Sequence, residues 1–241
     1  MRIVIASDTH KKPLSSLNIP DGDLFIHCGD FTSRLERVRG YRQRFWQGGP
    51  DERPARPQPE FRPVSREDHL AQVAAFNDEL GALPHQYKVV VGGNHDAPLE
   101  WLGEAAGSLL SNAVYLQDEL VEIAGLRIYG SPWQPEHHKW AFNLPRGSAE
   151  LAAVWAKVPD LVDVLITHGP PKGILDRTPE WPSVGDELLL DRVMAVRPLL
   201  HCFGHVHQSY GKLERDGIIF VNACVLDERY NIRNAPIVID L

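Results

Sequence analysis

The stretch YKVVVGGNHD at residues 87–96 joins a short apolar run to two glycines and three polar side chains. Its first half, Tyr87 to Val91, is rich in β-branched residues and predicts a buried strand. Asn94, His95 and Asp96 therefore follow a strand end. Open α/β sheets place their chemistry on the loops at strand ends, so this stretch predicts both a sheet and a site.

The same arrangement of an apolar run followed by metal-binding residue types recurs along the chain. It recurs at Asp8-Thr9-His10, Gly29-Asp30, Thr167-His168-Gly169 and Gly204-His205-Val206-His207. Carboxylate, amide and imidazole side chains are the ligand set typical of divalent manganese, iron or zinc. Seven such side chains are too many for one tetrahedral ion and suit two ions that share a bridging carboxylate. They are Asp8, His10, Asp30, Asn94, His168, His205 and His207.

Length and composition predict a protein with a sizeable core and no membrane segment. With 241 residues and 43% hydrophobic content, one domain over residues 1–241 is expected. The three cysteines have no C-x-x-C pairing, which favours a reducing, cytoplasmic location. No segment approaches the ~20 apolar residues that span a bilayer. The net charge of −7 disfavours nucleic acid as a partner, and no feature of the sequence predicts an oligomeric state.

The periodicity along the chain predicts an α/β fold. Helices are expected at Arg66–Leu83, Ser148–Lys157 and Asp186–Val196, with Leu70, Val73, Phe76 or Asn77, and Leu80 on the buried face of the first. Strands are expected between them, and hairpins in the second half. Alternating strands and helices followed by hairpins indicate two sheets with helices outside.

Between Arg34 and Arg66 the chain changes character, with nine arginines against four acidic residues. Its Pro- and Gly-rich part, at about residues 48–63, predicts a basic loop insertion without regular helix or sheet. We expect a solvated surface loop; the alternative is a basic lid that meets substrate phosphate.

The order and spelling of the motifs resemble the calcineurin-like metallophosphoesterase family, whose pattern is D-x-H, G-D, G-N-H-D/E, an isolated H and G-H-x-H. The resemblance runs from Ile3 to the C-terminus. It implies that family's four-layer α/β/β/α sandwich, in which two mixed β-sheets are flanked by helices. Further stretches are similar to the metallophosphoesterase-domain-containing (MPPED-type) branch. They are HCGDFT (27–32), YGSPW (129–133), WAFNLPRG (140–147) and THGPP (167–171).

The resemblance also implies a role for each site residue. Asp8, His10 and His207 would hold a first divalent ion. Asn94, His168 and His205 would hold a second, with Asp30 as the bridge. Mn²⁺ is the expected metal, and Fe²⁺, Zn²⁺ and Mg²⁺ are alternatives. Two such ions supply a strong nucleophile and cancel charge on the phosphoryl oxygens.

Two residues beside these ligands are predicted to be catalytic. His95 is similar to a non-ligand histidine of the family that contacts the phosphoryl group and protonates the leaving oxygen. Asp96 is expected to orient the His95 ring and raise its pKa; the alternative is a helix cap.

The remaining histidines are expected to be structural, because a buried histidine is usually a satisfied core residue. They are His27, His69, His85 and His201. The pair His137-His138 lies between two tryptophans. It is expected on the surface, and the alternative is a wall of the substrate pocket that stacks a nucleobase.

The predicted function is hydrolysis of a phosphate ester by a dinuclear metal centre, with a phosphodiesterase favoured over a monoesterase. The expected partner is a small organic phosphate or a nucleotide, including a cyclic nucleotide by analogy with the branch. The alternatives are a nucleotide-binding regulator with little turnover, a phosphomonoesterase, and a nuclease. The acidic balance disfavours the nuclease.

Overall fold

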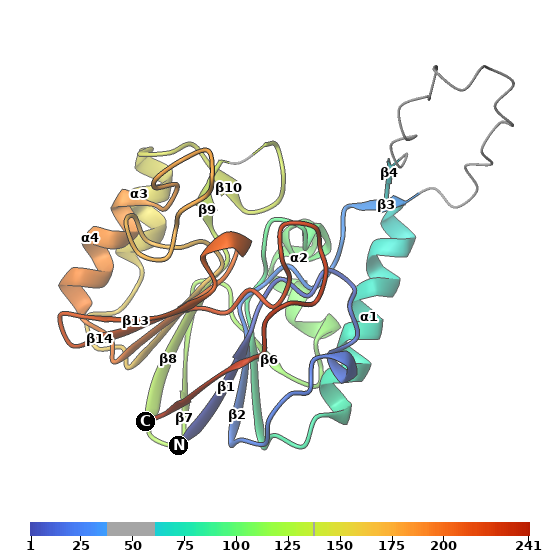
Figure 1. Cartoon of the computed structure of the whole chain (residues 1–241), viewed down its shortest axis with the longest axis horizontal. Coiled ribbons are helices and arrows are strands. Elements are labelled where there is room, and N and C mark those ends of the chain that lie inside the picture. The colour runs from blue at the N-terminus through green and yellow to red at the C-terminus, as the bar shows by residue number, and fades with distance from the viewer. Residues whose placement is uncertain (38–60, 137) are drawn as a thin grey trace, which may run out of the picture.

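Two mixed β-sheets lie face to face in the computed structural model, which describes residues 1–37, 61–136 and 138–241 (Figure 1). The first sheet has the order β15-β1-β2-β5-β6 and the second β13-β14-β12-β11-β8-β7. The first contains β1 (Arg2–Ala6), β2 (Leu24–His27), β5 (Tyr87–Val90), β6 (Val114–Tyr115) and β15 (Ile237–Asp240). The second contains β7 (Glu119–Ile123), β8 (Leu126–Ser131), β11 (Val164–Thr167), β12 (Leu200–Phe203), β13 (Gly211–Arg215) and β14 (Ile218–Asn222).

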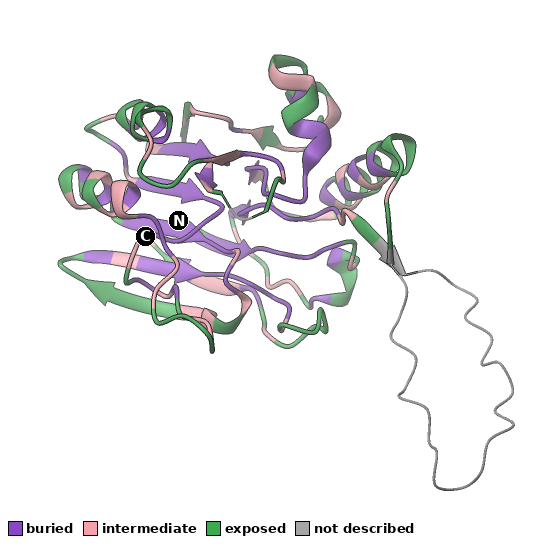
Figure 2. Cartoon of the chain, turned by 90° about the horizontal axis from the view of Figure 1, so that it is seen from above, coloured by how far each residue is buried: buried purple, intermediate pink, exposed green. Residues whose placement is uncertain are grey.

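Helices cover the outer face of each sheet (Figure 1). The helices α1 (Arg66–Ala82) and α2 (Ala97–Leu102) flank the first sheet, and α3 (Ala149–Ala156) and α4 (Glu187–Val196) flank the second. Buried residues therefore lie on the inner strands, and exposed residues gather on the helices, the loops and the edge strands β7 and β13 (Figure 2). This is the predicted four-layer α/β/β/α sandwich. Within the described part of the chain, no helix is both long and apolar enough to cross a membrane.

Three apolar clusters fill the three spaces between the layers. Alternate residues of a strand point to opposite faces, so β1 sends Ile3 and Ile5 between the sheets and Val4 toward α1. On the other side, Trp155 of α3 and Val193 of α4 pack against the second sheet. The buried β-branched runs that predicted the strands are thus explained by two covered faces.

The three predicted helices begin where expected. Ser65, Ser148 and Asp186 are their N-caps, and each side chain accepts a backbone N–H of the first turn. One prediction within α1 is wrong, because Leu70 is exposed. His69, which was expected to be structural, is buried beside it and places Nε2 3.0 Å from the Ser33 carbonyl oxygen.

The predicted loop at about 48–63 needs a correction at its end. Phe61–Pro63 forms the strand β4, which pairs antiparallel with β3 (Leu35–Arg37). Pro63 stands at the end of this two-stranded pair, where the missing N–H is tolerated. Residues 48–60 lie outside the described part of the chain.

Several short elements were not predicted. They are α2, the 3₁₀ turns Leu14–Ser16, Gly103–Leu109 and His207–Ser209, and the paired strands β9 (Gln134–Pro135) and β10 (Asn143–Leu144). Each is too short to show a hydrophobic period.

Candidate metal centre

Parallel strands deliver the predicted site residues to one edge of the two sheets. The strands β1, β2 and β5 are adjacent and parallel, and so are β8, β11 and β12. The loops after β1, β2 and β5 carry the first three motifs, and the loops after β11 and β12 carry the last two. Parallel strands end at the same edge of a sheet, which is why motifs far apart in sequence meet there.

Sharp backbone turns aim the side chains into the cleft. Asp8, His10, Asp30 and His205 have positive φ angles of 58°, 40°, 58° and 67°. Such conformations are uncommon for residues other than glycine and concentrate at functional sites. Gly29, which precedes Asp30, has a φ of 96°. A Cβ atom there would lie 2.6 Å from the Gly92 carbonyl oxygen, so only glycine fits.

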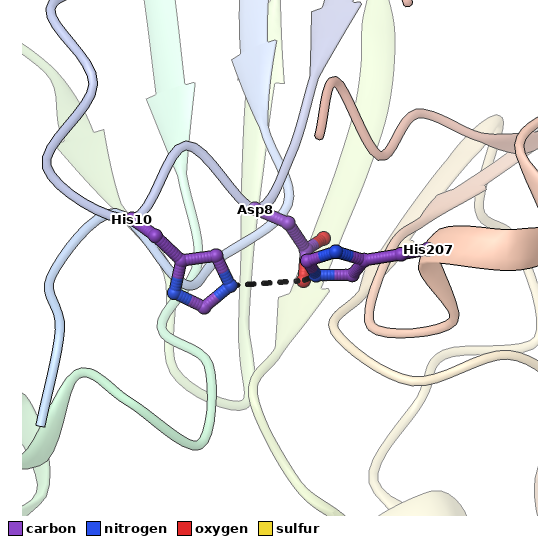
Figure 3. A group of neighbouring side chains, drawn as sticks. All are labelled: Asp8, His10 and His207. Atoms are coloured by element: carbon purple, nitrogen blue, oxygen red, sulfur yellow. Dashed lines mark ion pairs between the residues drawn. The ribbon is translucent and has the colours of Figure 1, made fainter. Parts of the chain in front are cut away.

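Asp8, His10 and His207 form the first cluster (Figure 3). The Nε2 atom of His207 lies 3.3 Å from Asp8 Oδ1, and that of His10 lies 3.9 Å from the same oxygen. The three side chains come from opposite sheets and converge on one point, so they could hold one ion between them.

Asp30, His168 and His205 form a second cluster. The Nε2 atom of His168 lies 3.4 Å from Asp30 Oδ2 and 2.9 Å from Asn94 Oδ1. The same Oδ2 atom lies 3.8 Å from Nε2 of His10, in the first cluster. Asp30 therefore stands between the clusters, and the structure brings all seven predicted ligand side chains together.

Three of these histidines are held in the tautomer that leaves Nε2 able to bind a metal. Each places Nδ1 against a backbone carbonyl, which can only accept, so Nδ1 carries the hydrogen. In the neutral ring the lone pair is then on Nε2, facing the carboxylates, as in metal-bound histidines. The pairs are His10 with Thr32 (3.2 Å), His168 with Cys28 (2.8 Å) and His207 with Asp227 (2.9 Å).

His95 has the opposite arrangement. The backbone N–H of Arg34 donates to its Nδ1 atom at 3.4 Å, so the neutral ring carries its hydrogen on Nε2. That nitrogen lies 3.9 Å from Asp30 Oδ2, at the centre of the site. The ring is buried, and the Trp140 ring packs edge-on against it, with 4.6 Å between the ring centroids. His95 is therefore presented as a hydrogen-bond donor, although its ring is close enough to count with the ligands.

The charges of the metal-free centre are paired. Burial lowers the pKa of His168 and His207, but Asp30 and Asp8 respectively raise it, to about 9 in each case. Burial raises the pKa of Asp30 and Asp8, but the neighbouring histidines bring it well below its usual value. Carboxylates and protonated imidazoles thus hold each other in place, and a bound dication would take over the role of those protons.

The donor set fits divalent cations. Asp8 Oδ1 is buried and makes no hydrogen bond within the described ranges, and its ion-pair partner is Nε2 of His207, 3.3 Å away. Its other oxygen, Oδ2, accepts from Ser7 Oγ (2.6 Å), the His205 N–H (2.9 Å) and Cys224 Sγ (3.1 Å). One oxygen is therefore fixed by the protein while the other is left for a cation, in a site of carboxylate, amide and imidazole donors.

The structure gives Asp96 a different role from the predicted one. Its carboxylate accepts backbone N–H groups of Asp30 (2.7 Å), Gly93 (2.9 Å) and Thr32 (2.9 Å). Burial and the charge of Asp30 raise the pKa of Asp96 to about 7, against the effect of these hydrogen bonds. Burial lowers the pKa of His95, so the expected direction there is also wrong. Asp96 is the N-cap of α2 by position, but its side chain braces the ligand loops instead.

The four histidines expected to be structural are buried outside the clusters. His27 pairs with Thr9 Oγ1 at 3.2 Å and His201 with Thr167 Oγ1 at 2.9 Å. Burial lowers the pKa of both to about 3, so they are neutral core residues.

The centre opens into a cleft of about 710 Å³. Trp140 and Trp181 line it, and Trp181 is largely exposed. Along one wall, Glu187 pairs with both Arg146, at 2.8 Å, and Lys172. The cleft is much larger than a phosphate group and so has room for an organic substituent. His137 lies outside the described residues, and the neighbouring His138 is exposed, with its ring 4.9 Å from that of Trp140.

Two residues of the centre were not predicted. Tyr230 packs its ring against those of His10 (4.8 Å) and His207 (5.4 Å). It lies on an irregular loop, and no sequence signal marks it. Gln134 donates Nε2 to Asn94 Oδ1 at 3.0 Å. It follows the predicted strand at 126–129, so the rule that chemistry lies at strand ends could have found it.

Comparisons with known proteins agree with this geometry. A sequence profile described as Calcineurin-like phosphoesterase matches residues 1–209. The human protein named Metallophosphoesterase domain-containing protein 1 is 39% identical over 265 residues, which covers 100% of this chain and 71% of that protein. One solved structure aligns with a TM-score of 0.62 at 19% identity and covers 92% of this chain and 89% of its own. The structure of TT1561 of Thermus thermophilus aligns with a TM-score of 0.51 at 14% identity, covering 92% of this chain and 88% of its own. At 19% and 14% identity, these two structural alignments show a common fold and nothing more.

Proposed function

The chain belongs to the calcineurin-like phosphoesterase family, in its metallophosphoesterase-domain-containing branch, and we propose that it is a phosphodiesterase that acts on a small organic phosphate or a nucleotide. The family is one of metal-dependent phosphoester hydrolases with a dinuclear centre, and this chain has the clustered His and Asp side chains for it. The diester preference, the substrate and the metal, Mn²⁺, are parts of the proposal.

The observation that carries the proposal is the position of Asp30 between two clusters. Its Oδ2 atom lies 3.4 Å from His168 Nε2 and 3.8 Å from His10 Nε2. We assign Asp8, His10 and His207 to the first ion, Asn94, His168 and His205 to the second, and Asp30 to both. Two divalent ions, when bound, activate a water and offset the charge of the phosphoryl oxygens.

The protein's own groups orient the substrate and the ligands. His95 presents Nε2–H to the centre because the Arg34 N–H fixes its Nδ1. In our proposal this group donates a hydrogen bond to a phosphoryl oxygen. Because Nδ1 accepts from the Arg34 N–H, the neutral ring has no second proton to transfer, and the leaving oxygen takes its proton from solvent. Asp96 holds the backbone from which both Asp30 and His95 project, so we count it as a positioning residue.

The cleft supports a substrate larger than inorganic phosphate. Its volume of about 710 Å³ and the aromatic rings of Trp140 and Trp181 suit a ligand with a planar or apolar part. The net charge of −7 supports a small substrate over a nucleic acid. A cytoplasmic location stays a prediction from the cysteines, all three of which are free and buried.

The test combines metal content with turnover. Protein purified without chelator is assayed by elemental analysis and for hydrolysis of a p-nitrophenyl phosphodiester and the matching monoester with added Mn²⁺. About two equivalents of metal and faster cleavage of the diester would support the proposal. Faster cleavage of the monoester would make the protein a phosphomonoesterase. Two metals with no turnover would favour the alternative, a nucleotide-binding regulator. Little metal, with no rescue by manganese, would reject the metal centre itself.

A further inference from the structure

A chain of side-chain amides runs from the cleft wall to the proposed second ion. Gln134, which is buried, donates through Nε2 to Asn94 Oδ1 and to Asn143 Oδ1, both at 3.0 Å. Asn143 in turn donates Nδ2 to the backbone carbonyl oxygen of His138 at 3.3 Å. Each amide presents one defined end to the next.

The direction of this chain is set by its far end. A backbone carbonyl can only accept, so Asn143 must turn its NH₂ group toward His138. Its oxygen then faces Gln134, which must offer NH₂ to it. That same NH₂ group supplies the hydrogen to Asn94, so the Asn94 amide must present its oxygen. The Oε1 atom of Gln134 is buried without a partner among the residues that the structure describes, so Nε2 alone holds this amide in place.

The other side of Asn94 shows why this direction matters. His168 donates Nδ1–H to the Cys28 carbonyl oxygen, so its neutral ring has a lone pair on Nε2, 2.9 Å from Asn94 Oδ1. Two lone pairs that face each other at this distance repel, unless a cation or a proton lies between them. If the Asn94 amide turned over, its NH₂ group would hydrogen-bond to Nε2 of His168. The site would then be satisfied without metal and would lack one oxygen ligand.

We propose that Gln134 is a positioning residue that keeps the Asn94 amide turned with its oxygen toward the second metal ion. The inference rests on the proposed function, because it needs Asn94 as a ligand. It adds that Asn94 alone does not secure binding of the second ion in this chain, which also needs the Gln134 amide after β8. Gln134 thereby prevents the Asn94 NH₂ group from donating to Nε2 of His168, which would occupy the lone pair that the metal needs.

Two substitutions test this directly. Gln134→Glu replaces the NH₂ group by a second acceptor, which favours the turned-over Asn94. Gln134→Leu removes the donor without adding charge. Mn²⁺ is titrated into each variant, and binding is monitored by calorimetry and by electron paramagnetic resonance. The resonance spectrum distinguishes a coupled pair of ions from a single ion. We expect both variants to bind the second ion about 10- to 100-fold more weakly, the range for losing a residue that orients a metal ligand, while the first ion binds as in the wild type.

A charge control separates orientation from electrostatic attraction. Gln208→Glu adds the same charge to the same cleft at an exposed position. A carboxylate that acted only through its charge would tighten Mn²⁺ binding in both glutamate variants. Equal or tighter binding of the second ion by Gln134→Glu, or unchanged binding by Gln134→Leu, would overturn the inference. Thermal unfolding in chelator must show that each variant is folded.

The outcomes also separate this inference from the proposed function. A wild type that binds two Mn²⁺ ions without turnover would reject the enzymatic function, and the effect of Gln134 on the second ion would still decide the inference. A wild type that binds fewer than two ions would overturn both.

Discussion

Gly204 lies where any side chain would collide with a proposed ligand of the first ion. A Cβ atom at this position would stand 2.1 Å from Asp8 Oδ2 and 2.1 Å from Ser7 Oγ. Ordinary contacts need at least about 3 Å, so in Gly204→Ala these atoms must retreat by about 1 Å or the loop must move. Asp8 Oδ2 cannot retreat freely, because Ser7, His205 and Cys224 all donate hydrogen bonds to it.

The expected cost follows from overpacking a rigid site. Inserting a methyl group into a packed site costs about 1–3 kcal/mol, which lowers the melting temperature of a domain of this size by about 2–4 °C per kcal/mol. Because Asp8 is displaced, we also expect metal uptake to fall below the wild-type level. The assay is thermal unfolding with chelator and with saturating Mn²⁺. The variant should lose both stability in chelator and part of the additional stability that Mn²⁺ gives the wild type.

The matched control is Gly107→Ala, which adds the same methyl group where no atom lies within 4 Å. It should be neutral or stabilising by up to about 1 kcal/mol, because alanine restricts the unfolded chain. If Gly204→Ala melted like this control and bound Mn²⁺ like the wild type, the assigned position of Asp8 would be wrong.

Three further predictions concern the charges of the centre. Asp30→Asn removes the shared negative charge and should abolish hydrolysis and lower metal content while circular dichroism stays native; wild-type rates would rule out the bridging role. His95→Ala should keep both metals by elemental analysis yet lose roughly 10²–10³-fold in rate, the range for losing one hydrogen-bond donor to the transition state, whereas loss of metal would make His95 a ligand. In chelator, the pKa of about 9 for His168 and His207 lies above the usual 6.5, so their pairing stabilises fully below pH 6.5 and is lost as pH rises to 9. Urea unfolding at pH 6.5 and pH 9 should show this fall, and a rise would contradict the assigned pairing.

The sequence predicted those parts of the fold that depend on local periodicity. The run Tyr87 to Val91 predicted β5 because both faces of that strand are covered, and the capping side chain of Ser148 marked the start of α3. The exposure of Leu70 was missed because the neighbouring His69, held by the Ser33 carbonyl oxygen in a tertiary contact, takes the buried position instead. The pair β3 and β4 was missed because the prolines of Phe61–Pro63 and its neighbours indicate a loop.

In the candidate site, too, local sequence patterns were predictable and tertiary contacts were not. Residue types at strand ends could be read in order, so the seven candidate ligands were named as a set, and the structure brings their side chains together. The role of Asp96 could not be predicted from the sequence, because its three partners are backbone N–H groups that the fold brings together. Gln134 was overlooked since a glutamine after a strand carries no motif of its own.

The histidines show most clearly what the fold adds to the motifs. Two of the motifs place His10 and His95 at strand ends in much the same way, and both rings approach Asp30. The Thr32 carbonyl oxygen accepts from Nδ1 of His10, whereas the Arg34 N–H donates to Nδ1 of His95. One ring therefore turns a lone pair toward the centre and the other turns a hydrogen. Thr32 and Arg34 lie on the single loop that follows β2, so the conformation of this one loop decides which imidazole can bind a metal and which can donate a hydrogen bond.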